Sequence, residues 1–205
     1  MIDAKTISLF GCPVSIYKDT FYLNKNEFDF ILGQELDGVS DDKIVKTSKN
    51  VKILNNIELN RVKNLIDSYA KDYVEKIMSV KNIFYLTHSW IARSKKNEPH
   101  HEHCHQSAIF SVVYYIQADK ASITFNGDKN FLTRSFNFEF NYTNFNEFNS
   151  MTVELPVKSG DMLIFPGYVK HSAKNYSDSE KIVLGANYFV KGKIGVYEKT
   201  TLLDL

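Results

Sequence analysis

Four of the six histidines in this chain lie close together, at positions 100, 101, 103 and 105, and another, His171, lies far along the chain. Neutral imidazole is the commonest side-chain metal ligand near neutral pH. Nitrogen-rich sites suit iron, copper, nickel and zinc. A dense histidine cluster with one distant histidine therefore predicts a metal site built from two separate parts of the chain.

The spacing within the cluster selects the ligands that we predict. His103 and His105 are two residues apart, and in a β-strand residues i and i+2 point to the same face. Both imidazoles can then converge on one ion while Cys104 points the other way. His171 would complete a three-histidine set that leaves coordination positions open, so we predict His103, His105 and His171 as the metal ligands.

Other uses of the same cluster remain open. His100 and Glu102 form a competing pair, which with His171 would give the two-histidine, one-carboxylate site of non-heme iron oxygenases. A histidine loop that binds metal adventitiously, or a structural zinc site that uses Cys104, would also fit the cluster alone. The segment 160–171 argues against these two, because a Gly-Asp turn, an apolar strand and a Pro-Gly break together present the distant histidine.

A second chemical feature follows ten residues after His171. Lys181, Val183, Gly185 and Asn187 alternate along a predicted strand and therefore share one face. If that face points into a barrel, the buried lysine needs an anionic partner. A dicarboxylate such as 2-oxoglutarate would supply one, whereas the alternative is a lysine exposed at the edge of a sheet.

The first part of the chain is expected to be helical. Apolar residues at 3.6-residue spacing predict helices over residues 26–37 and 57–79, with Asn55 and Glu58 as a capping pair for the second. Residues 7–17 are expected to form a strand or extended arm, and residues 39–52 a polar loop.

After residue 80 the hydrophobic period changes from 3.6 to 2. Strands are predicted at residues 82–92, 108–117, 121–126, 131–140, 150–155, 161–165 and 181–190. Consecutive short strands without intervening helices indicate a barrel or sandwich. We therefore predict a mainly β protein with flanking α: a double-stranded β-helix (jelly roll or cupin-like barrel) with N-terminal helices packed on one sheet.

We expect one domain over residues 1–205. Residues 1–80 would form the helical flank and residues 81–205 the barrel core. Within the core, the phenylalanine-rich residues 129–149 would form either an aromatic hairpin or a lid over the barrel mouth.

Composition limits the classes of partner. The chain has 25 basic and 24 acidic residues, a net charge of +1, so no general attraction to nucleic acid is expected. No apolar run approaches the ~20 residues of a membrane-spanning helix, so no membrane partner is expected. Two cysteines and an N-terminus without signal-peptide features predict a cytoplasmic location. The oligomeric state is left open.

Five segments carry a resemblance to a known family. Residues 9–17 are similar to its opening LFPTPIY, residues 89–90 to its SW strand, residues 102–116 to HxH…SGVYYL, residues 160–171 to GDLLLFPSxLxH, and residues 181–187 to RxSLxxN. Over nearly its whole length the chain thus resembles the 2-oxoglutarate/Fe(II)-dependent oxygenases common in tailed phages and marine bacteria. If the protein is encoded by a phage, the expected location is the cytoplasm of the host.

The resemblance implies roles for the site residues. His103 and His171 would be iron ligands, and His105 would take the place of the usual carboxylate. Lys181 would take the role of the arginine that pairs with the distal carboxylate of 2-oxoglutarate. Lysine differs from arginine here because its ammonium is a point charge and cannot donate a bidentate pair of hydrogen bonds to a carboxylate.

Two further residues are predicted to bind the cosubstrate, namely Tyr115 and Asn187. The chain also differs from the family pattern at Val112, where glycine is usual, and at Gln106, where proline is usual.

We therefore expect a non-heme Fe(II)- and 2-oxoglutarate-dependent dioxygenase that hydroxylates an unidentified substrate, with no catalytic residue beyond the metal ligands. The alternative is a cupin-like metal-binding protein (isomerase, other dioxygenase or binding module) without 2-oxoglutarate, because Gly160, Pro166 and His171 also fit the cupin spacing. A third possibility is a non-catalytic structural or interaction protein that keeps the barrel but has lost the catalytic activity. Lys181 favours the first, because a cupin needs no inward cation at that position.

Overall fold

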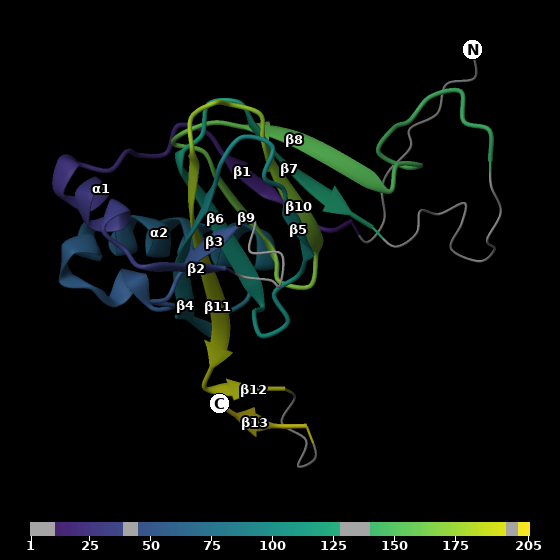
Figure 1. Ribbon diagram of the computed structural model, residues 1–205. Helices are drawn as coiled ribbons and strands as arrows, with labels where there is room; N and C mark the ends of the chain where they lie inside the picture. The colour runs from purple at the N-terminus through teal and green to yellow at the C-terminus, as the bar shows by residue number, and fades with distance from the viewer. Residues whose placement is uncertain (1–10, 39–44, 128–139, 196–200) are drawn as a thin grey trace.

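A computed structural model describes residues 11–38, 45–127, 140–195 and 201–205. Two β-sheets face each other, and two α-helices lie together outside the larger sheet (Figure 1). Among the described residues, the larger sheet has seven strands, the smaller has four, and a separate two-stranded hairpin lies near the C-terminus. No helix among the described residues is long and apolar enough to cross a membrane.

The strands of the larger sheet lie in the order β1 (Ser15–Tyr17), β9 (Met162–Pro166), β6 (Phe110–Gln117), β11 (Lys181–Lys191), β4 (Ile83–Ser94), β3 (Lys46–Ser48) and β2 (Leu36–Gly38). Those of the smaller sheet lie in the order β5 (His100–His103), β10 (Lys170–Asn175), β7 (Ala121–Asn126) and β8 (Thr152–Val157). The C-terminal hairpin consists of β12 (Lys193–Ile194) and β13 (Leu203–Asp204).

The eight strands from β4 to β11 are divided between the two facing sheets. β4, β6, β9 and β11 lie side by side in the larger sheet, and β5, β10, β7 and β8 form the smaller one, with antiparallel pairing throughout. This arrangement is a double-stranded β-helix. The predicted fold class, mainly β with flanking α, is confirmed.

The first helix, α1 (Lys25–Leu32), begins at a capping box. The Asn24 side chain accepts a hydrogen bond from the Glu27 backbone N–H (3.0 Å), and the Glu27 carboxylate accepts one from the Asn24 N–H (2.8 Å). These bonds satisfy two donors at the helix start that would otherwise lack partners. The helix ends at Leu32 and not at residue 37, because residues 36–38 pair with β3 as β2.

The second helix, α2 (Asn60–Tyr73), buries one stripe of apolar side chains against the larger sheet. It follows two 3₁₀ turns (Ile53–Asn55 and Ile57–Leu59) and continues into a π-helical turn (Val74–Met78). The predicted capping by Asn55 and Glu58 is wrong, because both residues lie within the 3₁₀ turns that come before the helix.

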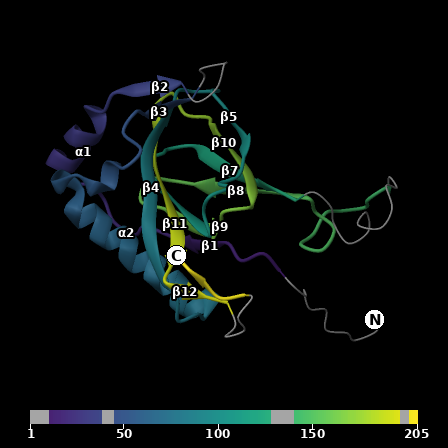
Figure 2. The same cartoon turned by 90° about the horizontal axis from the view of Figure 1, so that it is seen from below.

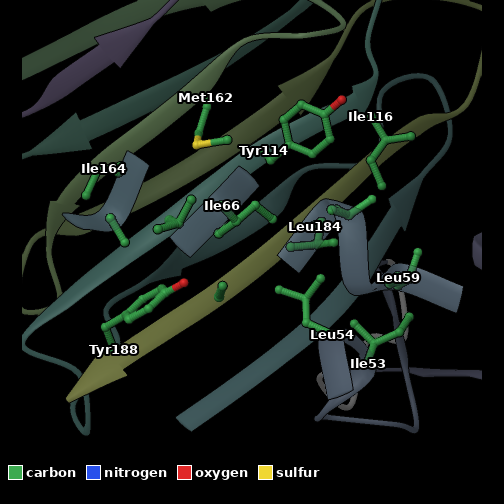
Figure 3. Close-up of a cluster of buried hydrophobic side chains, with 14 of the residues drawn as sticks. Ile53, Leu54, Leu59, Ile66, Tyr114, Ile116, Met162, Ile164, Leu184 and Tyr188 are labelled. Atoms are coloured by element: carbon green, nitrogen blue, oxygen red, sulfur yellow. The ribbon is translucent and has the colours of Figure 1, made fainter. Parts of the chain in front are cut away.

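Both faces of the larger sheet are buried, which explains its continuous apolar strands. Residues 110–116 of β6 are all buried and alternate between the faces. The helix-facing core includes Ile66, Tyr114, Ile164, Leu184 and Tyr188 (Figure 3). The core between the sheets includes Val113, Tyr115, Phe125, Leu163 and Phe165.

Strand β11 divides its residues between these two layers. Ile182, Leu184 and Ala186 pack in the helix-facing core. Lys181 and Gly185 line a cavity on the opposite face, where the smaller sheet covers the larger one. Figure 2 shows both helices on the side of β4 and β11 that faces away from β5 and β10. The alternation predicted for this strand is therefore confirmed.

Sequence periodicity missed six of the described strands, β2, β3, β5, β10, β12 and β13. Residues 46–48, within the predicted loop 39–52, form β3. In β10 the residues that point inward are His171, Ala173 and Asn175, so the strand has a buried face without an apolar pattern. Most of the predicted strand 131–140 lies outside the described residues, and residues 140–149 form no regular strand.

Candidate metal centre

The imidazoles of His103, His105 and His171 converge inside the barrel. One nitrogen from each ring can be chosen so that all three atoms lie within 4.8 Å of one another. The ring centroids are 4.3 Å apart for His103 and His171, and 5.1 Å apart for His105 and His171. Bonds of about 2.0–2.1 Å from histidine nitrogen to a shared ion fit this spacing.

Strand pairing brings two of these histidines together. His171 on β10 lies directly opposite His103 on β5. Side chains directly opposite on antiparallel strands have Cβ atoms about 4.5–5.5 Å apart. The two imidazoles therefore converge although 68 positions separate them in the sequence.

His105 reaches the site by a different route. Strand β5 ends at His103, so His105 does not belong to the strand that the i, i+2 argument assumed. Its backbone N–H instead donates to the carbonyl of Gly167 (2.7 Å). A Cβ at position 167 would lie 2.3 Å from the carbonyl oxygen of Ala108, so only glycine allows the close approach that holds this turn beside His105.

Hydrogen bonds assign the same tautomer to all three rings. Nδ1 of His103 faces the carbonyl of His101 (2.9 Å), and Nδ1 of His171 faces the carbonyl of Val169 (3.0 Å). A carbonyl only accepts, so each Nδ1 carries the proton and each Nε2 keeps its lone pair. A lone pair on Nε2 is what a metal ion requires.

The third ring is oriented through two more side chains. Nδ1 of His105 lies 2.5 Å from Oγ of Ser111, and the Ser111 hydroxyl donates to Oδ1 of Asn187 (2.8 Å). Since the serine proton is used by Asn187, the serine oxygen accepts from His105 Nδ1–H. His105 therefore also presents an unprotonated Nε2.

Burial keeps these rings neutral. Desolvation, followed by the influence of His103, lowers the pKa of His105 to about 4 and that of His171 to about 3. Desolvation also lowers the pKa of His103. Neutral imidazoles are the ligand form, so no proton has to leave before a metal binds near neutral pH.

We predict that Ser111→Ala lowers metal affinity about 10- to 100-fold, the usual cost of losing a hydrogen bond that orients a ligand. Without the serine, His105 can rotate or change tautomer. The single tryptophan, Trp90, has its ring 5.4 Å from that of His105, so metal titrations can be followed by its fluorescence. The control is Ser122→Ala, a buried serine bonded to Glu154. Equal affinity in both variants would show that Ser111 does not orient the ligand.

A cavity extends from the triad into the barrel and contains an unpaired cation. Lys181 lines it and is only 4% exposed, and its Nζ has no hydrogen-bond partner among the described residues. Desolvation lowers the pKa of Lys181 to about 8. None of the described residues that line this cavity is an aspartate or a glutamate. An anionic ligand is therefore the partner that fits.

The other predicted cosubstrate residues lie nearby. Tyr115 lines the same cavity and is buried, and burial together with the Asp161 carboxylate raises its pKa, so the phenol stays a neutral donor. Asn187 does not line this cavity. It borders an outer groove, and its Oδ1 accepts from Ser111.

The outer groove also adjoins two histidines of the triad. His103 and His105 line both the groove and the inner cavity, as do His100 and Trp90. His100 stacks on His103 with ring centroids 4.4 Å apart. The remaining described lining of the groove consists of Thr47, Val51, His88, His101, Ser107 and Asn187.

The competing ligand sets are not brought together. Glu102 is exposed and accepts a hydrogen bond from Asn126 (2.5 Å), and neither it nor Cys104 belongs to the converging group. His100 is close to the triad without belonging to that group. The geometry therefore favours the three-histidine set over the pair of His100 and Glu102.

Sequence analysis did not assign roles to His88, Ser94 or Ser111. Ser111 carries a weak signal, a single small polar residue at the start of an otherwise apolar strand. Ser94 carries none, because serine at a strand end is unremarkable.

The double-stranded β-helix with an inward histidine triad defines a class of metal-binding barrels, and solved structures share this fold. HygX from Streptomyces hygroscopicus, solved with nickel, 2-oxoglutarate and hygromycin B bound, is 11% identical, with 86% of this chain and 82% of that chain covered and a TM-score of 0.59. The non-heme alpha ketoglutarate dependent carbocyclase SnoK from nogalamycin biosynthesis is 14% identical, with coverage of 89% and 81% and a TM-score of 0.59. A prolyl-4-hydroxylase from Pseudomonas putida is 11% identical, with coverage of 86% and 92% and a TM-score of 0.54.

Within this class, the family model described as "Putative 2OG-Fe(II) oxygenase" matches residues 88–187, just under half of the chain. The match includes all three histidines of the triad and Lys181. No curated protein matches the sequence. At the level of this family the predicted resemblance and function class are confirmed, and the predicted cofactors, Fe(II) and 2-oxoglutarate, are those that the family description names.

Proposed function

We propose that this protein is an Fe(II)- and 2-oxoglutarate-dependent oxygenase that hydroxylates a small molecule. The observation that carries the proposal is that one cavity holds three neutral imidazoles and a buried cation for which the described residues supply no anion. A metal ion explains the first feature and a dicarboxylate explains the second.

Different residues would hold the metal and the cosubstrate. His103, His105 and His171 would hold iron through Nε2. Lys181 would hold the distal carboxylate of 2-oxoglutarate, and Tyr115 would donate to the same molecule. Iron and 2-oxoglutarate, when bound, supply the oxidising chemistry, in which O₂ is consumed and succinate and CO₂ are released.

The protein's own contribution is orientation and exclusion of water. The inner cavity is lined by apolar residues such as Val113, Ile123 and Val183, which would limit the access of solvent to the cosubstrate. The outer groove is open to solvent and touches His103 and His105. We propose that the primary substrate enters there, so that one C–H bond is presented to the metal from the side opposite Lys181.

Asn187 would serve this site in a different way from the one predicted by the sequence. Its contact with Ser111 supports a role in orienting His105, while direct binding of the cosubstrate by Asn187 stays a prediction. A single domain over residues 1–205, a cytoplasmic location and an origin in phages or marine bacteria also stay predictions.

The test is turnover of 2-oxoglutarate by protein purified without chelators. We expect slow formation of succinate that requires both Fe(II) and O₂, even without the primary substrate, and that His171→Ala abolishes. Metal binding without any binding or turnover of 2-oxoglutarate would contradict the proposal and favour the cupin-like alternative. A panel of candidate small molecules would then be screened for those that accelerate succinate formation and gain one oxygen atom by mass spectrometry.

A further inference from the structure

Ser94 lies directly opposite Lys181, on the neighbouring strand β4 of the larger sheet. Directly opposite residues in an antiparallel pair point to the same face, with Cβ atoms about 4.5–5.5 Å apart. Both side chains line the inner cavity. A serine hydroxyl and a lysine ammonium thus lie side by side in the same cavity.

Neither group has a hydrogen-bond partner in the part of the chain that the structure describes. Ser94 is 2% exposed and Lys181 is 4% exposed. Within the described part of the chain, Ser94 Oγ and Lys181 Nζ are the two buried side-chain nitrogen or oxygen atoms without a hydrogen bond. Leaving a buried polar group unpaired costs stability, and most such groups in folded proteins are paired. Two unpaired neighbours in one cavity indicate a common ligand.

Other buried serines nearby are paired. Ser89, on the same strand as Ser94, accepts a hydrogen bond from the Leu54 N–H (3.0 Å). Ser111, on β6, is bonded to both His105 and Asn187. The missing partner is therefore particular to Ser94 and does not reflect a general property of serines in this sheet.

We propose that the Ser94 hydroxyl binds the distal carboxylate of 2-oxoglutarate together with Lys181, an inference that rests on the proposed function. A carboxylate has two oxygens, and a lysine ammonium does not match both as a planar guanidinium would. The Ser94 hydroxyl supplies the second donor. Two donors on adjacent strands thereby take the place of the two N–H donors with which one arginine guanidinium binds a carboxylate.

The proposal predicts opposite effects on binding and on stability. Ser94→Ala should weaken 2-oxoglutarate binding about 10- to 100-fold, the range for a hydrogen bond to a charged group. The same substitution should leave the thermal stability of the cosubstrate-free protein unchanged or raise it, because it removes an unpaired hydroxyl. A merely structural role for Ser94 would lower stability instead.

Calorimetry with Mn(II) in place of iron measures the affinity without turnover. The probes are 2-oxoglutarate and 2-oxobutyrate, which lacks the distal carboxylate. Ser94→Ala should weaken the first and leave the second unchanged. Ser94→Cys keeps the volume but offers only a weak donor, so it should behave like the alanine variant. The matched control, Ser89→Ala, should lower the melting temperature and leave 2-oxoglutarate affinity as in the unmodified protein.

The outcomes separate this inference from the proposed function. If the unmodified protein binds 2-oxoglutarate and both Ser94 variants bind it equally well, the role of Ser94 is wrong and the proposed function survives. If Ser94→Ala weakens both probes alike, the hydroxyl does not act on the distal carboxylate. If the unmodified protein binds no 2-oxoglutarate, the proposed function itself has failed.

Discussion

Replacing His171 by alanine should lower the affinity for Fe(II) on the order of a thousandfold. Loss of a residue that merely orients a ligand costs about 10- to 100-fold, and loss of the ligand itself must cost more. His171 is 4% exposed, so no solvent-exposed side chain can move in to replace it without rearranging the core. The measurement is an anaerobic Fe(II) titration followed by the fluorescence of Trp90.

The control for this variant is His101→Ala. His101 is exposed and contributes its backbone carbonyl, not its side chain, to the orientation of His103. Its replacement should therefore leave Fe(II) affinity within a few-fold of the original. If His171→Ala binds Fe(II) as tightly as His101→Ala does, the three-histidine site is wrong and the ligand set must be sought elsewhere.

Replacing Lys181 by methionine should weaken 2-oxoglutarate binding about tenfold to a thousandfold while metal binding is largely kept. Truncating one partner of a sheltered charge pair has effects of this size, because the remaining charge is left unpaired. Methionine keeps most of the apolar stem and removes the desolvated ammonium. The cosubstrate-free variant should therefore be at least as stable as the original. Calorimetry with Mn(II) and thermal unfolding measure the two effects.

The dependence on pH provides a second measurement of the same prediction. Burial lowers the pKa of Lys181 to about 8, so in the unliganded protein the ammonium is present below that pH and is lost above it. Affinity for 2-oxoglutarate should accordingly fall as the pH rises above about 8. In Lys181→Met this loss should be absent. Lys191→Met, an exposed lysine at the far end of β11, is the matched control and should keep both the affinity and its pH dependence.

Unchanged 2-oxoglutarate affinity in Lys181→Met would remove the main reason for preferring an oxygenase over a cupin-like protein. A fall in stability without a fall in affinity would instead indicate that the lysine has a structural role, such as pairing with an anion that is bound permanently in the cavity.

Some features of this protein follow from sequence alone because they depend on local periodicity. The change of hydrophobic period near residue 80 predicted the mainly β core, and alternation along residues 181–187 placed Lys181 on the inner face of β11. The isolated position of His171 and the two-residue spacing of His103 and His105 selected three histidines whose nitrogens lie together, although His105 lies beyond the end of β5. The β core and the inward position of Lys181 are set by residue type and by the geometry of single strands.

Other features depend on contacts between distant segments. His105 is placed by its bond to Gly167 and not by strand alternation, and its tautomer is decided by Ser111 and Asn187 from two other strands. Strand β10 was missed because two of its three inward residues, His171 and Asn175, are polar. Asn175 is buried where its side chain donates to the carbonyl of Ser94 on another strand.

Which buried polar groups lack a hydrogen-bond partner is also decided by the tertiary structure. Whether Lys181 is paired depends on which side chains the cavity places around it, and no local pattern along β11 specifies them. Ser94 lies 87 positions away in sequence and becomes its neighbour only through the antiparallel register of β4 and β11. Local periodicity thus determined which residues face inward, while strand pairing decided which of them meet, because a register relates residues that the sequence keeps far apart.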